Sequence, residues 1–137
     1  MKNIIFVDTV AWLALVNKSE DLHDAARTVR DRLVKQKTKL ITTDFVVVEI
    51  ANSLARLPLR GIAQKLIDFI RTSDSVELVT ITSELSEKAY QLYCTRDDKE
   101  WGLTDCTSFV VMEKMKMNQA FTADRHFEQA GFTILLK

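Results

Sequence analysis

The stretch IIFVDTVAWLALV (residues 4–16) decides the fold class. Its first four residues are apolar and mostly β-branched, a pattern typical of a strand that is buried on both faces. The strand ends at Asp8, and an apolar helical pattern over 10–16 follows directly. Open α/β sheets bind their ligands at the carboxyl ends of their strands, so Asp8 is predicted to lie at a ligand-binding edge.

The rest of the chain alternates in the same way between strand-like and helical patterns. Short apolar runs predict further strands at 39–42, 76–80, 120–122 and 133–136. Apolar residues at helical spacing predict helices around 22–33, 47–54, 62–70 and 85–93, then from Thr104 toward Met117 and over 124–130. This alternation predicts one three-layer α/β/α domain over residues 1–137, with a central, mainly parallel sheet of about five strands.

Local signals predict where the helices begin and end, and which faces they bury. Thr43 or Asp44 can cap the helix after the second strand, and Leu57-Pro58 should end that helix. Thr104 should cap the helix after the long loop, and Gly131 suits a helix C-terminus. The residues expected to face the core are Val47, Ile50, Ala51 and Leu54 in one helix, and Ile62, Leu66, Phe69 and Ile70 in the next.

The composition narrows the classes of function. Acidic and basic residues balance at 19 each, so no overall field attracts nucleic acid or an anionic membrane, and a polyanion must be bound locally. Three scattered glycines exclude a phosphate-binding P-loop or a dinucleotide motif. Cys94 and Cys106 have neither disulfide-framework nor zinc spacing, and no apolar run is long enough for a signal peptide or a membrane span. A reduced, soluble, cytoplasmic protein is expected.

Four carboxylates are predicted to meet at the carboxyl edge of the sheet. Asp8 ends the first strand, and Asp124 follows a very short later strand. Glu49 lies one turn into the helix after the second strand, and Asp105 opens the helix after the long loop. In a parallel sheet all these points fall on the same edge.

Two of these carboxylates lie in surroundings that otherwise exclude charge. Glu49 interrupts the apolar run 46–51, and Asp105 lies between Leu103 and an apolar helix. Such a carboxylate must be paired, protonated or bound to a cation, and clustered oxygen ligands suit Mg²⁺ or Mn²⁺. Without metal the carboxylates repel one another, so at least one should have a raised pKa. The pattern predicts metal-assisted phosphodiester hydrolysis.

Purely structural roles are the alternative for each carboxylate taken alone. Asp8 and Asp105 could be anions near helix N-termini, and Asp124 could be a helix cap. Glu49 is the hardest to explain in this way, because it lies inside a helix among apolar residues. The four together favour a metal site.

The same positions resemble the four signature segments of the PIN-domain ribonucleases. These segments are FVDT (6–9), VEIAN (48–52), LTDC (103–106) and FTADRHF (121–127), and their order and spacing match over essentially the whole chain. Among the members of this family, the chain is most similar to the toxin ribonucleases of VapBC-type toxin–antitoxin pairs.

The resemblance implies an RNA substrate, Mg²⁺ or Mn²⁺ as cofactor, a homodimer and a small antitoxin partner. It implies metal-binding roles for Asp8 and Asp105. It implies that Glu49 and Asp124 complete the acidic pocket. It also implies that the hydroxyls of Thr9 and Thr104 orient water or a ligand.

The polar loop 96–102 and the last signature segment contain further candidates. Asp97, Asp98 and Glu100 form an acidic run, interpreted as a solvated loop, with an outer role in the pocket as the alternative. Trp101 could stack on a base or cover the edge of the core, and His126 could contact a phosphate or be a plain surface residue. The basic residues that could contact RNA phosphates are Arg96, Lys99, Arg125 and the lysines of 114–116.

Other functions fit the chain less well. A stand-alone RNA-processing nuclease would share the site and lack the antitoxin partner. A receiver module needs an acceptor aspartate at the end of the third strand, and residues 78–81 contain none. A haloacid-dehalogenase-like phosphatase needs an aspartate where Val10 stands. A non-catalytic binding module would have no need of four converging carboxylates.

Overall fold

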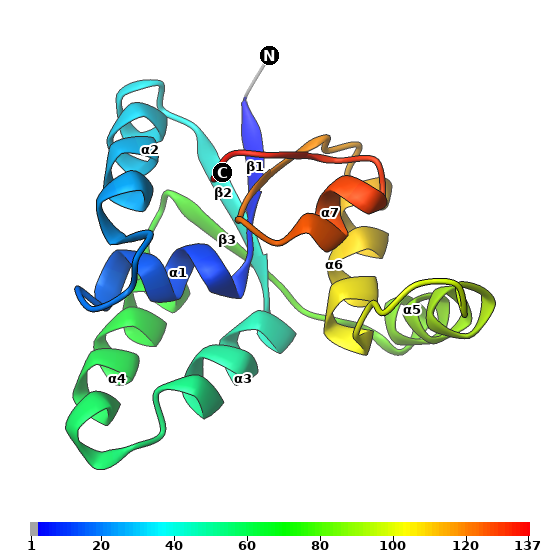
Figure 1. The fold of residues 1–137 in the computed structure, drawn as a ribbon, viewed down its shortest axis with the longest axis horizontal. Coiled ribbons are helices and arrows are strands. Elements are labelled where there is room, and N and C mark those ends of the chain that lie inside the picture. Colours follow the sequence, from blue (N-terminus) through cyan, green and yellow to red (C-terminus); the bar gives the residue numbers. More distant parts are fainter. Residues whose placement is uncertain (1–2) are drawn as a thin grey trace.

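The computed structural model describes residues 3–137, and Figure 1 shows its fold. Within these residues, five parallel strands form a sheet in the order β3-β2-β1-β4-β5. The strands are β1 (Ile4–Val7), β2 (Lys39–Thr43), β3 (Val76–Val79), β4 (Gln119–Phe121) and β5 (Thr133–Ile134). The predicted parallel sheet of about five strands is confirmed.

Helices cover both faces of this sheet. Figure 1 shows α1, α2 and α4 on one side of the sheet and α5, α6 and α7 on the other, which confirms the predicted three-layer arrangement. The helices in the described residues are α1 (Thr9–Val16), α2 (His23–Lys35), α3 (Asp44–Ser53), α4 (Leu57–Thr72), α5 (Ser83–Thr95), α6 (Leu103–Lys114) and α7 (Arg125–Gln129). Among the described residues, no helix is both long enough and apolar enough to cross a membrane.

The strand order places a crevice between β1 and β4. The chain runs outward from β1 through β2 to β3, then crosses to the other side of β1 for β4 and β5. Ligands of open α/β sheets bind where the strand order reverses in this way, beyond the carboxyl ends of the strands. Val7 pairs with Phe121, so Asp8 and Thr122, the residues that directly follow the two strands, are neighbours at this point.

Aromatic packing holds α6 and α7 against the sheet. Phe6 of β1 is fully buried and packs against Phe127 of α7, with 6.2 Å between the ring centroids. Phe127 in turn makes an edge-to-face contact with Phe109 of α6 at 4.9 Å. Rings in this geometry add to the stabilisation that comes from burial alone. The N-terminal ends of α6 and α7 are therefore held near the ends of β1 and β4.

Several predicted boundaries are wrong. Helix α3 ends at Ser53, and Pro58 lies in the first turn of α4, where the missing amide hydrogen costs no helical hydrogen bond. Thr104 is inside α6; the N-cap is Gly102, whose amide donates to the Asp105 carboxylate. Strand β5 has two residues rather than four, and β2, β3 and β4 differ from prediction by one residue at one or both ends.

Two predicted core-facing residues are exposed. Ala51 faces solvent, because the buried stripe of α3 consists of Val46, Ile50 and Leu54. Phe69 is 50% exposed on α4, where Leu66 and Ile70 are buried. The spacing correctly predicts that each helix has one apolar face. The residues of that face that point into the core can shift by one position around the helix without changing the spacing. Thr43 does cap α3, and Gly131 has the positive φ of 98° that a helix C-terminus favours.

Candidate active site

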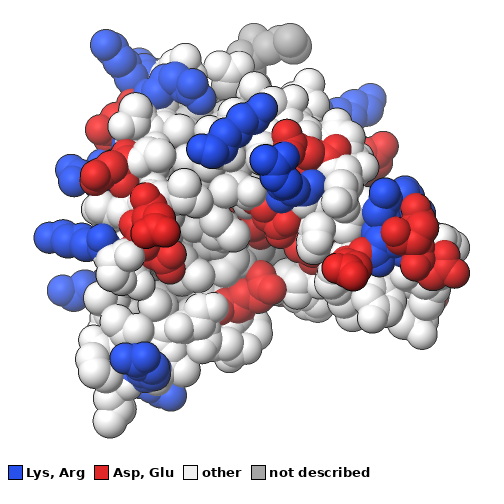
Figure 2. Space-filling model, in the orientation of Figure 1, with Lys and Arg blue, Asp and Glu red and all other residues white. Residues whose placement is uncertain are grey.

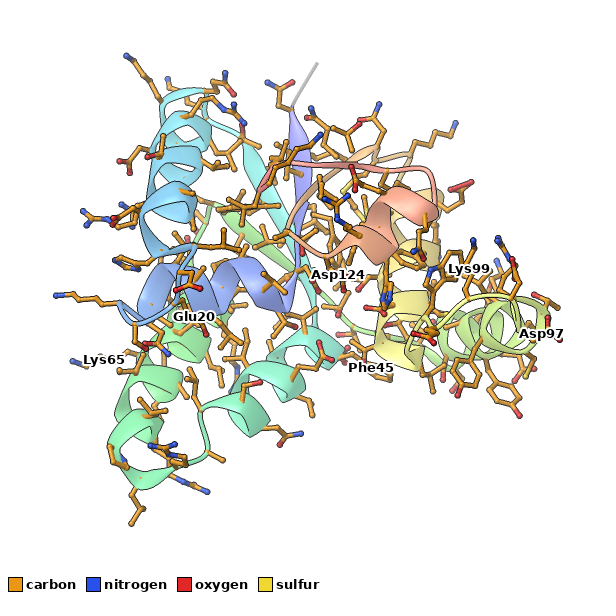
Figure 3. All side chains as sticks on the ribbon, in the orientation of Figure 1. Glu20, Phe45, Lys65, Asp97, Lys99 and Asp124 are labelled. Carbon is orange, nitrogen blue, oxygen red and sulfur yellow. The ribbon has the colours of Figure 1, made fainter. Side chains whose placement is uncertain are left out.

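Four acidic side chains line one hollow at the C-terminal edge of the sheet. Asp8 follows β1, Asp124 follows β4, Glu49 is on α3 and Asp105 is in the first turn of α6. The hollow has a volume of about 420 Å³, and the residues that line it are Asp8, Thr9, Val10, Glu49, Asn52, Ser53, Asp105 and Asp124. Figure 2 shows acidic side chains in the hollowed middle of this face, and Figure 3 shows Asp124 between α1 and α6. The chain thus brings the four predicted carboxylates together.

Asp8 is the most deeply buried of the four. Its side chain is 5% exposed and accepts a hydrogen bond from the Thr122 hydroxyl at 2.9 Å. It makes no side-chain cap to α1, so it is not an ordinary helix cap. Burial raises the pKa of Asp8 from 3.8 to about 7, with smaller contributions from the charges of Asp105 and Glu49. One carboxylate therefore has a raised pKa, although loss of water rather than mutual repulsion is the main cause.

Thr122 connects the ends of β1 and β4, and it is a site residue that was not predicted from the sequence. Its hydroxyl is fully buried, donates to Asp8 and accepts the backbone amide of Asp124 at 3.1 Å. Strand pairing between Val7 and Phe121 creates this contact. The signal available in the sequence is a hydroxyl residue that follows a strand two positions before an aspartate.

The two predicted hydroxyl residues have different surroundings. Thr9, the first residue of α1, donates its hydroxyl to Oε1 of Glu49 and lines the hollow. Thr104 is half-buried near the start of α6 and is absent from the described lining of the hollow. Its backbone carbonyl accepts the hydroxyls of Thr107 and Ser108. This geometry supports a role in the acidic site for Thr9 more directly than for Thr104.

His126 lies between two of the carboxylates. Its Nδ1 is 3.0 Å from Asp105 Oδ2 and 3.5 Å from Asp124 Oδ1. Asp124 also accepts the His126 amide at 2.9 Å, so the predicted cap role of Asp124 at α7 is confirmed. One potential ligand atom from each of Asp105, Asp124 and His126 lies within 4.8 Å of the others. These three residues could hold a metal ion, with Asp8 and Glu49 on the walls of the same hollow.

The other candidates of the loop 96–102 lie away from the hollow. Figure 3 shows Asp97 at the outer end of α5, far from Asp124, and Asp98 pairs with Arg96 at 3.0 Å. Trp101 is 5% exposed and packs edge-to-face on Phe109 at 5.0 Å, so it covers the core and is not available to stack on a base. The acidic run is therefore a solvated loop, as the main interpretation predicts.

The comparisons with known proteins agree with the fold. The model of the PIN domain family matches residues 5–133, and the chain belongs to this family. It is 32% identical over 129 residues to the 23S rRNA-specific endonuclease VapC20 of Mycobacterium tuberculosis, covering 94% of this chain and 95% of that protein.

Solved structures give the same result. The crystal structure of VapC20, described as a sarcin–ricin loop cleaving toxin, matches with a TM-score of 0.83 over 94% of this chain and 96% of that one. VapBC2 from Rickettsia felis, solved bound to a DNA fragment from its promoter, matches with a TM-score of 0.71, at 13% identity and 96% coverage of each chain. At that identity the second match shows a shared fold alone.

Proposed function

We propose that this chain is a metal-dependent endoribonuclease that acts as the toxin of a toxin–antitoxin pair. The observation that carries the proposal is the hollow at the β1–β4 crevice, where the catalytic carboxylates would be Asp8, Glu49, Asp105 and Asp124. VapC20, which is 32% identical over nearly the whole chain, is a 23S rRNA-specific endonuclease. This similarity supports an RNA substrate, and a cytoplasmic place of action belongs to the same proposal.

The residues of the hollow fit Mg²⁺ or Mn²⁺. The described lining contains four carboxylates and no lysine or arginine, so the acidic charge has no partner within it. Hard oxygen donors of this kind are the ligands that both ions prefer. Asp8 and Asp105 would be the main ligands, with Glu49 and Asp124 completing the acidic pocket. A bound ion would stabilise the negative charge that develops on a phosphodiester.

Hydrogen bonds within the chain orient two of these carboxylates for binding a cation. Thr122 and Thr9 each donate a hydroxyl to one carboxylate, Asp8 and Glu49 respectively. A hydrogen bond of this kind restricts the rotation of the carboxylate and leaves its other oxygen able to bind a cation or water. The arrangement supports hydrolysis with little rearrangement of the protein.

The direct test is cleavage of RNA in the presence and absence of metal. The purified chain should cleave total RNA with Mg²⁺ or Mn²⁺, and an excess of chelator should stop cleavage reversibly, because the carboxylates alone cannot stabilise a developing negative charge. Electrophoresis of the products measures this. Undiminished cleavage in excess chelator would remove the metal from the proposal, and no cleavage with either metal would favour a non-catalytic binding module.

An apolar groove is the proposed site for the antitoxin. It lies between α1, α2 and α4, has a volume of about 1010 Å³, and includes Phe69 and Val34, which are 50% and 67% exposed. Thr38 lines the groove with a hydroxyl that is buried and has no hydrogen-bond partner among the described residues. The charged residues of its described lining are four basic residues and one acid, namely Arg30, Lys37, Lys39, Lys65 and Asp74. These features favour an amphipathic segment with acidic side chains as the occupant.

A growth assay tests both the toxin role and the groove. Expression of this chain alone should stop bacterial growth, and co-expression of the product of the neighbouring gene should restore it. Phe69→Glu should remain toxic under co-expression, because losing a phenylalanine that the antitoxin would bury costs about 2 kcal/mol, or more than tenfold in affinity. The control is Leu57→Glu, at a residue that is 86% exposed and outside the described lining of the groove.

Two outcomes would contradict these expectations. Continued growth with soluble, RNA-cleaving protein present would favour the stand-alone processing nuclease. Full rescue of Phe69→Glu would exclude the groove as the antitoxin site.

A homodimer and a single domain over residues 1–137 also belong to the proposal. Tyr90 and Tyr93 on α5 are about half exposed and stack on each other, with 6.4 Å between their ring centroids. Aromatic side chains of this kind are enriched at interfaces between subunits. Helix α5 is therefore the proposed dimer contact.

A further inference from the structure

The Asp105 carboxylate is held from two sides through a single oxygen. Its Oδ2 accepts the backbone amide of Gly102 at 3.0 Å and lies 3.0 Å from Nδ1 of His126. No hydrogen bond to Oδ1 is formed by the described residues. The side chains of Asp105 and His126 are 18% and 31% exposed, so water competes only partly for these contacts.

The chemistry of the pair defines which nitrogen carries the proton. An ionised carboxylate can only accept, so the contact requires Nδ1 of His126 to be the donor. The backbone amide of His126 donates to Asp124 at the same time. His126 therefore links the starts of two helices. Its ring contacts Asp105 at the start of α6, and its backbone amide donates to Asp124 at the start of α7.

We propose that His126 is a positioning residue for the metal site rather than one of its ligands. By donating its Nδ1 hydrogen to Oδ2, it holds the Asp105 carboxylate in the orientation that leaves Oδ1 free to bind the cation. The inference rests on the proposed function, in which Asp105 is a metal ligand, and adds a residue outside the described lining of the hollow. Hydrogen bonds from such outer residues orient a ligand and affect metal affinity.

The arrangement allows a matched set of variants. In His126→Asn the side-chain amide lies close to the position of Nδ1 and can still donate to Asp105. In His126→Gln the amide is one carbon further out, and His126→Ala has no donor. The Ala and Gln variants should bind Mn²⁺ about 10- to 100-fold more weakly than the native protein. The Asn variant should remain within about threefold of it, because the donor at that position is kept.

Calorimetric titration of the metal-free protein with Mn²⁺ measures the affinity without any reaction. Melting curves in chelator show whether each variant is folded. If the Ala variant does not fold, the comparison of Asn with Gln decides the matter, since both side chains are polar amides. RNA cleavage at saturating Mn²⁺ should recover in the Gln variant, because excess metal compensates for weaker binding.

Three results would overturn the inference. Native affinity for Mn²⁺ in folded Ala or Gln variants would show that the hydrogen bond does not position a ligand. A folded Asn variant as weak as Gln would show that a donor at Nδ1 is not what matters. A native protein that neither binds Mn²⁺ nor cleaves RNA would overturn the proposed function as well, which separates that failure from the first two.

Discussion

Asp8→Asn is expected to slow RNA cleavage by a factor of about a thousand or more, and Asp105→Asn should have a similar effect. The amide keeps the shape of the carboxylate and removes the charge that binds the cation. A bound metal stabilises the charge of the transition state by several kcal/mol, and each 1.36 kcal/mol corresponds to a factor of ten in rate. Cleavage rates at saturating Mg²⁺, measured on a labelled RNA, test this expectation.

Asp97→Asn is the matched control for this experiment. Asp97 is an exposed acid, and Figure 3 shows it far from Asp124. The control loses one negative charge as the active-site variants do, and it should cleave RNA at the native rate. A folded Asp8→Asn or Asp105→Asn variant that cleaves within about tenfold of the native rate would contradict the assignment of these residues to the metal.

Asp8→Asn is also expected to make the metal-free protein more stable, by about 2 kcal/mol near pH 8. Burial raises the pKa of Asp8 from 3.8 to about 7 in the folded protein. Ionising a buried carboxylate opposes folding, and an amide avoids that cost. The shift by itself corresponds to about 4 kcal/mol, and part of this is lost because asparagine is a weaker acceptor for Thr122.

The sign of the pH dependence follows from where the proton is held. Between about pH 4 and pH 7 the folded protein keeps a proton on Asp8 that the unfolded chain releases. Asp8 therefore destabilises the metal-free protein increasingly as the pH rises through this range, and the effect is complete above about pH 7. The advantage of Asp8→Asn should be small near pH 4 and largest near pH 8.

Urea denaturation in chelator, at several pH values in this range, measures the difference. Added Mg²⁺ should then stabilise the native protein and leave the variant nearly unchanged, since a ligand stabilises only the state that binds it. If Asp8→Asn is less stable than the native protein at every pH in chelator, the carboxylate is a structural element of α1, and its place in a metal site is wrong.

Several features of the site could be predicted because they depend on local sequence. Asp8 ends an apolar strand, and the carboxyl end of such a strand is a ligand-binding edge in any parallel sheet. Glu49 stands out because a charge among apolar residues of a helix needs a partner or a cation. Asp124 lies between β4 and α7 in the sequence, so both its place beyond the strand and its role as the N-cap of α7 could be predicted.

Other features depend on contacts between segments that are distant in the sequence. Thr122 and Asp8 are 114 residues apart and meet only because β4 pairs with β1 on the side opposite β2. Strand alternation predicts parallel strands but leaves their order open, since several orders satisfy the same pattern. His126 is 21 residues from Asp105, and the packing of Phe127 on Phe109 brings α7 to the start of α6.

The sequence by itself determined the alternating α/β fold, the apolar strand that ends at Asp8, and the presence of four carboxylates at one edge of the sheet. These follow from hydrophobic periodicity and from the cost of burying charge. The tertiary structure decided which groups hold each carboxylate, and that burial raises the pKa of Asp8. Burial is a property of the whole packed core, so no local stretch of residues can specify it.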